Sequence, residues 1–102
     1  MIHVIAVVTA KPGMREQVLQ AFRANVPAVR AENGCIEYGA AVDADPALKL
    51  QTRWGPDTFL VIEKWESMGA LKAHAAALHM AAYAAKTKEL IASRAIHVLS
   101  PV

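Results

Sequence analysis

Glu63-Lys64-Trp65-Glu66-Ser67 is the stretch where a strand pattern changes into an alanine-rich helical pattern. Residues 58–66 alternate with a period of two, which is typical of a strand. One side of this strand carries Phe59, Val61, Glu63 and Trp65, and the other carries Leu60, Ile62 and Lys64. Ser67 is a favoured N-cap, so we expect a helix from about Met68 to Ser93, with a break near residues 76–78.

The rest of the chain carries the same two patterns. Residues 2–9 are rich in valine and isoleucine and stop at Lys11-Pro12-Gly13, and residues 14–31 repeat apolar positions at helical spacing. Pro27 is expected to kink this helix or to begin a second short segment, and Asn33-Gly34 to end it. Further strands are expected at residues 35–42 and 95–99, whereas residues 47–57 form either a short extra strand or an ordered loop.

The order of these elements predicts an α+β fold, the ferredoxin-like β-α-β-β-α-β plait. Its four-stranded antiparallel sheet carries both helices on one face. The strands at residues 2–9 and 58–66 are apolar on both sides, so the second face of the sheet also needs a cover. We therefore expect a homodimer in which two sheets pack face to face.

Length and composition set limits on the class of protein. A chain of 102 residues predicts one domain, residues 1–102, and its 55% apolar content again favours a subunit interface. The net charge is +2 and the basic residues are scattered, which argues against a nucleic-acid partner. Cys35 is the single cysteine, so neither an intrachain disulfide nor a cysteine-based zinc site is expected.

Location is read from the apolar segments. The longest apolar runs are too short to span a membrane, and the first residues lack the basic segment and the cleavage pattern of a signal peptide. We therefore expect no membrane partner and a cytoplasmic location.

Aromatic and imidazole groups gather around the strand-to-helix junction. Trp65 ends the strand, and His74, His79 and Tyr83 follow on the predicted helix, so the four side chains are able to surround a flat organic molecule. The alternative is an ordinary core corner in which Trp65 and Tyr83 are filler. On a continuous helix the two histidines lie roughly 140° apart, a poor arrangement for a metal.

The chain also resembles the antibiotic-biosynthesis monooxygenase family, and within it the small quinol monooxygenase group. The likeness covers nearly the whole chain and rests on Val26-Pro27, Gly34-Cys35, Tyr38, Val42-Asp43, Pro56-Asp57, Trp65-Glu66-Ser67, His74 and His79-Met80. The resemblance implies a dimeric α+β barrel with a pocket between helices and sheet in each subunit. It also implies monooxygenase chemistry without metal, haem or flavin.

Without a cofactor, O2 has to take its electrons from the substrate, so the resemblance implies an electron-rich quinol or phenol. His74 or His79 is then the expected base for the phenolic proton. Trp65 is expected to stack on the aromatic ring and Tyr83 to hold an oxygen by a hydrogen bond. Asn25 is a further candidate for substrate binding, although an exposed polar residue on the first helix is the simpler interpretation.

Three departures from family patterns leave other functions open. Val61 stands where antibiotic-tailoring members carry an asparagine, and Ala84 where haem-degrading relatives carry their axial histidine. Val26 stands where isomerases of a phosphorylated sugar carry a histidine, yet those enzymes share the two later histidines. The alternatives are therefore an isomerase of a small keto or enol metabolite and a non-catalytic dimeric binding module.

Overall fold

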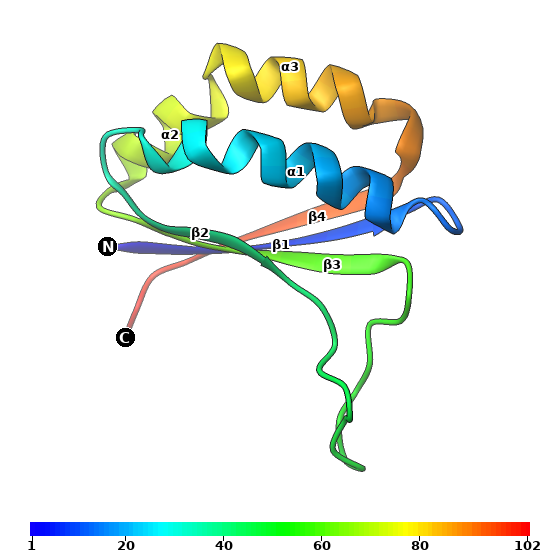
Figure 1. The fold of residues 1–102 in the computed structure, drawn as a ribbon. Coiled ribbons are helices and arrows are strands. Elements are labelled where there is room, and N and C mark those ends of the chain that lie inside the picture. Colours follow the sequence, from blue (N-terminus) through cyan, green and yellow to red (C-terminus); the bar gives the residue numbers. More distant parts are fainter.

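A computed structural model describes all residues 1–102 and has a four-stranded antiparallel sheet with its helices on one face (Figure 1). The predicted ferredoxin-like plait is confirmed. Its elements are β1 (Ile2–Ala10), α1 (Arg15–Arg30), β2 (Cys35–Ala41), β3 (Thr58–Trp65), α2 (Met68–Ala75), α3 (Leu78–Thr87), a 3-10 turn η1 (Lys88–Leu90) and β4 (Ile91–Leu99).

The strands lie in the order β2-β3-β1-β4, so β1 pairs with both β3 and β4. Ala6 of β1 lies opposite Val61 of β3 and Ile96 of β4. Because side chains alternate along a strand, this register puts these three residues on the same face of the sheet. This is the helix-covered face, since Val4, Ala6 and Val8 are buried while their neighbours on β1 are only partly so.

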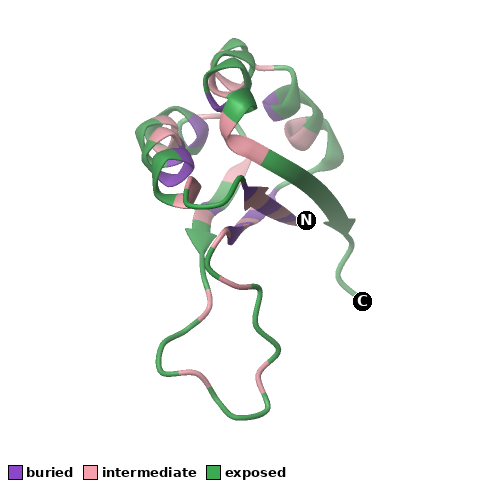
Figure 2. Ribbon diagram, turned by 90° about the vertical axis from the view of Figure 1, so that its right-hand side faces the viewer, coloured by how far each residue is buried: buried purple, intermediate pink, exposed green.

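The core lies between α1 and the sheet. Helix α1 buries Val18, Leu19, Phe22 and Val29 on one side. The ring of Phe22 stacks on Tyr38 at a centroid distance of 5.2 Å and meets Phe59 edge-on at 6.0 Å. Figure 2 shows the buried residues between helices and strands, whereas β4 is exposed along most of its length. The fold is therefore less well covered on the β4 side.

The strand-to-helix junction forms largely as predicted. The Ser67 hydroxyl accepts a hydrogen bond from the Ala70 amide and caps α2, and the helix breaks between Ala75 and Leu78. The predicted helix end at Ser93 is wrong, because α3 stops at Thr87 and Ile91 already pairs with β1. The open edge of β1 supplies backbone hydrogen bonds that outweigh the helical preference of these residues.

Pro27 lies inside α1, which runs without interruption from Arg15 to Arg30. The alternative of a second short segment is therefore wrong.

Residues 42–57 form a loop that projects from the sheet away from the helices (Figure 1). The possible extra strand in this region is not present. The Asp43 carboxylate holds the base of the loop, because its two oxygens accept hydrogen bonds from the amides of Trp54 at 3.0 Å and Gly55 at 2.9 Å. These two amides lower the pKa of Asp43, since they favour the ionised carboxylate.

The opposite face of the sheet has no helix over it. The alternation of each strand places Ile5, Val7, Leu60 and Ile62 there, and all four are only partly buried. This is the apolar face for which the sequence predicts a cover.

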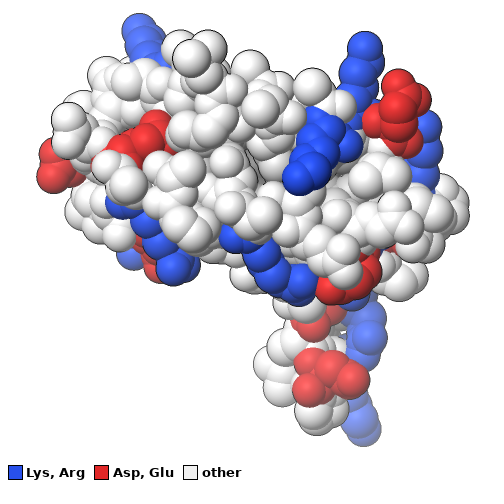
Figure 3. Space-filling view, turned by 45° about the horizontal axis from the view of Figure 1, so that its top comes forward, with Lys and Arg blue, Asp and Glu red and all other residues white.

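Over the face drawn in Figure 3, basic side chains stand apart with acidic ones among them. None of the helices has the length and apolarity that a membrane span requires.

Candidate functional site

A cavity of about 400 Å³ lies between the sheet and the helices α2 and α3, the position that the family resemblance implies. Its lining is mostly apolar, with 15 hydrophobic residues among 18. The sheet side of the lining comprises Val4, Ala6, Val8, Tyr38, Val61, Glu63, Ile91, Arg94, Ile96 and Val98. Only Glu63, His74 and Arg94 bring an ionisable carboxyl, imidazole or guanidinium group to this apolar surface, so they determine its chemistry.

His74 is the imidazole of the cavity and is only 5% exposed. Its Nδ1 atom lies 2.8 Å from Oε2 of Glu32, and its Nε2 atom lies 4.0 Å from Oε1 of Glu63. The ring packs on Trp65 at a centroid distance of 4.6 Å. An ionised Glu32 selects the tautomer in which Nδ1 carries the proton, which leaves Nε2 free to accept one.

Glu63 is a buried carboxyl group beside His74. The indole Nε1 of Trp65 donates a hydrogen bond of 2.9 Å to its Oε1 atom. Burial raises the pKa of Glu63, although the Trp65 N–H and His74 act in the opposite direction. A carboxyl group with a raised pKa in a cavity is a candidate for proton transfer.

His79 contacts Glu32, the same glutamate that His74 contacts. Its Nε2 atom is 3.2 Å from Oε2 of Glu32, but the contact is not aligned as a hydrogen bond and neither ring nitrogen has another partner. The break between α2 and α3 brings both histidines to one carboxylate, which a continuous helix does not allow. The chain nevertheless has no group of three or more potential ligands placed to hold a metal ion.

The remaining predicted site residues divide between the cavity and its surroundings. Tyr83 lines the cavity, and burial raises the pKa of its hydroxyl. Trp65 is fully buried at 0% exposure and does not line the cavity. Asn25 donates a hydrogen bond of 3.4 Å to the sulfur of Met80 and also lies outside the lining. Of the five predicted residues, the structure brings His74 and Tyr83 to the cavity, whereas Trp65, His79 and Asn25 are not part of its lining.

Sequence analysis missed Glu63, Glu32 and Arg94 as site residues. The signal for Glu63 was available, because it shares the apolar side of its strand with Phe59, Val61 and Trp65. Glu32 gave no local signal, since its partner His74 is 42 residues away in the sequence.

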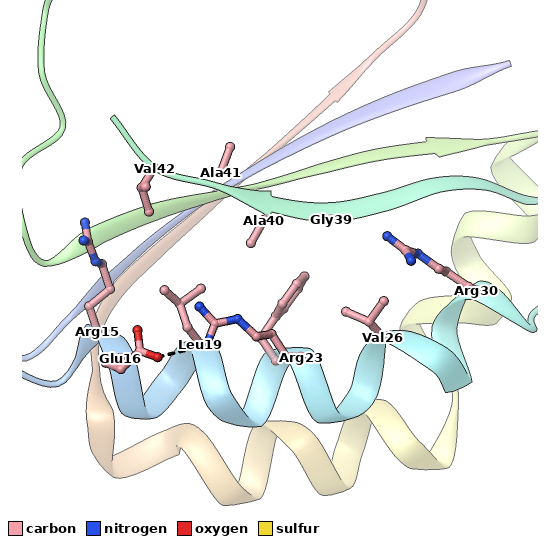
Figure 4. Close-up of a pocket in the computed structure, with 11 residues that line it drawn as sticks. Arg15, Glu16, Leu19, Arg23, Val26, Arg30, Gly39, Ala40, Ala41 and Val42 are labelled. Carbon is pink, nitrogen blue, oxygen red and sulfur yellow. Dashed lines mark hydrogen bonds and ion pairs between the residues drawn. The ribbon is translucent and has the colours of Figure 1, made fainter. Parts of the chain in front are cut away.

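A second hollow of about 530 Å³ lies between α1 and β2 (Figure 4). Three arginines point into it, Arg15 and Arg30 near its ends and Arg23 between them. Each is already engaged: Arg15 with the carbonyls of Gly55 and Thr58, Arg23 with Glu16, and Arg30 with the carbonyl of Tyr38. These guanidinium groups connect structural elements, so the apolar cavity is the better candidate site.

The sequence is similar to those of known proteins. The family model for antibiotic biosynthesis monooxygenases matches residues 1–86. The chain is 37% identical over 103 residues to YgiN of Escherichia coli K12, described as a probable quinol monooxygenase, and the alignment covers 99% of this chain and 98% of YgiN.

Two solved structures share the fold of this chain. The crystal structure of PA3566 from Pseudomonas aeruginosa superposes with a TM-score of 0.82 at 29% identity and covers 99% of this chain and 93% of that one. Rv0793 from Mycobacterium tuberculosis has a TM-score of 0.80 at 27% identity, with coverage of 99% and 94%.

Proposed function

The chain belongs to the antibiotic biosynthesis monooxygenase family, and on that premise we propose that it oxidises a quinol-type aromatic substrate with O2 in the cavity below α2 and α3. In this proposal the substrate itself supplies the electrons. The chain contributes an apolar binding surface, a base and the exclusion of water. The name of the relative YgiN supports a quinol as the substrate class.

One observation carries the proposal, namely the His74 imidazole at the wall of an apolar cavity with its Nδ1 atom on the Glu32 carboxylate. In that tautomer Nε2 is the basic atom and accepts the phenolic proton. Glu32 stabilises the imidazolium that results, since the carboxylate faces the ring at 2.8 Å. Glu63 lies on the Nε2 side and is able to take the proton onward.

The overall reaction balances in oxygen and electrons. One hydroquinone and one O2 give one hydroxyquinone and one water molecule, and four electrons pass from the substrate to the two oxygen atoms. The quinolate formed by His74 reduces O2 and bonds to it at a ring carbon. Cleavage of the O–O bond then leaves one oxygen on the ring as a carbonyl, and the other departs as water with protons from the substrate.

The other predicted residues receive roles that fit their positions. Tyr83, which lines the cavity, is proposed to hold a substrate oxygen by a hydrogen bond. Trp65 acts behind the wall, because its ring supports His74 and its N–H holds Glu63. Asn25 positions Met80, whose side chain is part of the lining. His79 contacts Glu32 and influences His74 through it.

We also propose that the uncovered sheet face joins two copies of the chain. Ile5 and Val7 of β1 and Leu60 and Ile62 of β3 form its apolar centre. An Ile62→Glu variant is expected to run as a monomer in size-exclusion chromatography with light scattering. An unchanged mass would contradict this interface.

The test of the reaction is oxygen uptake after mixing the protein with anaerobically reduced hydroquinones, compared with the autoxidation blank. Saturable uptake by the wild type that Glu63→Gln and His74→Gln both lose is the expected result. Uptake no faster than the blank across the panel would overturn the proposal. Exchange of solvent deuterium into a keto or enol metabolite would then point to an isomerase, and binding without turnover to a binding module.

A further inference from the structure

The charged groups of the cavity lie at two different levels of the sheet. Glu63 of β3 pairs with Val4 of β1, whereas Arg94 of β4 pairs with Val8. The two levels are four residues apart along β1, which corresponds to about 13 Å along the strand. His74 lies at the Glu63 level, so the proton-transfer groups and the guanidinium group stand at opposite ends.

Arg94 has no partner within the chain. Arg94 forms no ion pair, whereas Arg23 pairs with Glu16. Its guanidinium group donates no hydrogen bond, whereas those of Arg15 and Arg30 donate to backbone carbonyls. Its side chain lines the cavity and also an adjacent hollow of about 340 Å³, where Lys88 stands beside it. Lys88 likewise forms no ion pair. Arg94 is therefore an uncompensated cation at this end of the cavity, and Lys88 lines the adjacent hollow.

The surface between the two ends is apolar. Ala6, Val61 and Ile96 line the sheet side there, and Ala81 and Ala84 of α3 lie on the helix side. Small side chains on the helix leave room for a flat ring system. A ligand that uses both ends therefore has an aromatic body, a hydroxyl group at the His74 end and a negative charge at the Arg94 end.

We propose that the natural substrate carries an anionic group, with a carboxylate as the planar partner of Arg94, and that Arg94 selects it. The inference rests on the proposed function for the hydroxyl end of the substrate. Guanidinium and carboxylate form two parallel hydrogen bonds, so the pair fixes orientation as well as adding affinity. The ion pair between Arg94 and the carboxylate directs the phenolic oxygen toward His74. A neutral quinol lacks this pair and therefore binds more weakly.

The test measures equilibrium binding by calorimetry, and it requires no turnover. One ligand is a hydroxynaphthoate whose hydroxyl and carboxylate lie at opposite ends of the rings, and the other is the naphthol that lacks the carboxylate. The wild type is expected to prefer the naphthoate by about two- to fivefold, the effect of one exposed ion pair. Arg94→Gln is expected to abolish that preference without changing the affinity for the naphthol.

Two further variants make the result specific. Arg94→Lys keeps the charge but not the paired hydrogen bonds, so it is expected to retain part of the preference. Lys49→Gln removes an equal charge from the projecting loop and is expected to change neither affinity. Inorganic phosphate is the competitor: displacement of the naphthoate but not of the naphthol supports an anion subsite at Arg94.

Equal binding of the two ligands by the wild type, or a preference that survives Arg94→Gln, would overturn the inference. Binding of neither ligand would overturn it as well. The outcome is separate from that of the oxygen-uptake test. A preference lost in Arg94→Gln together with uptake no faster than the blank would keep the subsite and reject the monooxygenase reaction.

Discussion

The indole Nε1 of Trp65 donates a 2.9 Å hydrogen bond to Oε1 of Glu63, two residues earlier on the same strand. Both side chains lie on the helix-covered face, and the indole is completely buried. The tryptophan therefore supports a carboxyl group that lines the cavity instead of touching a ligand itself. Burial raises the pKa of this carboxyl group, and the indole N–H limits the rise.

Glu63 is expected to reduce the stability of the folded chain at alkaline pH. Below the ordinary pKa of 4.5 the carboxyl group is protonated in both the folded and the unfolded chain, so its raised pKa does not lower the free energy of unfolding. As pH rises from there through the raised pKa of the folded chain, the free energy of unfolding falls. Glu63→Gln keeps an oxygen for the Trp65 N–H, so its midpoint of thermal unfolding should exceed that of the wild type at pH 8 and converge with it near pH 4.

The control for this prediction is Glu37→Gln. Glu37 is an exposed glutamate that pairs with Lys64 at 3.5 Å, and its loss should change stability by less than about 0.5 kcal/mol at any pH. A Glu63→Gln variant less stable than the wild type at pH 8 would contradict the prediction.

His74 and His79 are expected to differ in their effect on turnover. His74 lines the cavity and His79 does not, although both lie within 3.2 Å of the Glu32 carboxylate. His74→Gln should lower kcat for quinol-dependent oxygen uptake by about a hundredfold or more, the contribution of a positioned base. His79→Gln should lower it much less. An equal loss of kcat in both variants would show that contact with the cavity does not decide which histidine is the base.

Glu32 is expected to set the tautomer of His74. Removal of its carboxylate in Glu32→Ala leaves Nδ1 without the acceptor at 2.8 Å, so the ring is free to place the proton on either nitrogen. Nitrogen NMR of the imidazoles should show the Nδ1-protonated form of His74 in the wild type and a mixture in the variant. Glu32→Gln, which retains an oxygen acceptor, should preserve the wild-type tautomer. The same mixture in the wild type would reject this role.

Asp43 is expected to hold the projecting loop in a pH-dependent manner. Its pKa is lowered by the amides of Gly55 and Trp54, so the stabilisation is present at neutral pH and is lost as pH falls through the folded pKa, below the ordinary value of 3.8. Asp43→Asn has one acceptor oxygen for two amides and should expose residues 44–54 to protease at neutral pH. Asp45→Asn, on the same loop, is the control and should not.

Local patterns predicted the parts of the fold that depend on neighbours in the sequence. The alternation of β3, the Ser67 cap and the break before Leu78 all belong to this class. The end of α3 was mispredicted because Ile91 to Arg94 join β1, and that pairing involves residues more than 80 positions away.

The same division applies to the candidate site. His74 was identified because it follows the strand-to-helix junction, and the structure brings it to the cavity. The contacts that define its chemistry come from Glu32 and Glu63, on other elements. Trp65 was expected as a cavity wall, since an aromatic side chain at a strand end fits either a wall or a core. Burial decided between the two, and burial depends on the packing of α2 against β3.

Gly34 is expected to be the glycine on which the position of α2 depends. Its φ is +85°, and an added Cβ would lie 2.6 Å from the Cβ of Ala70 in α2. Gly13 is the matched control, because its φ is +78° and nothing lies within 4 Å of an added Cβ. Gly13→Ala should cost about 1–2 kcal/mol in urea unfolding, the backbone strain alone. Gly34→Ala should cost about 1–3 kcal/mol more and also lower quinol turnover, since it displaces the helix that carries His74. Equal costs in the two variants would mean that α2 accommodates the methyl group without moving.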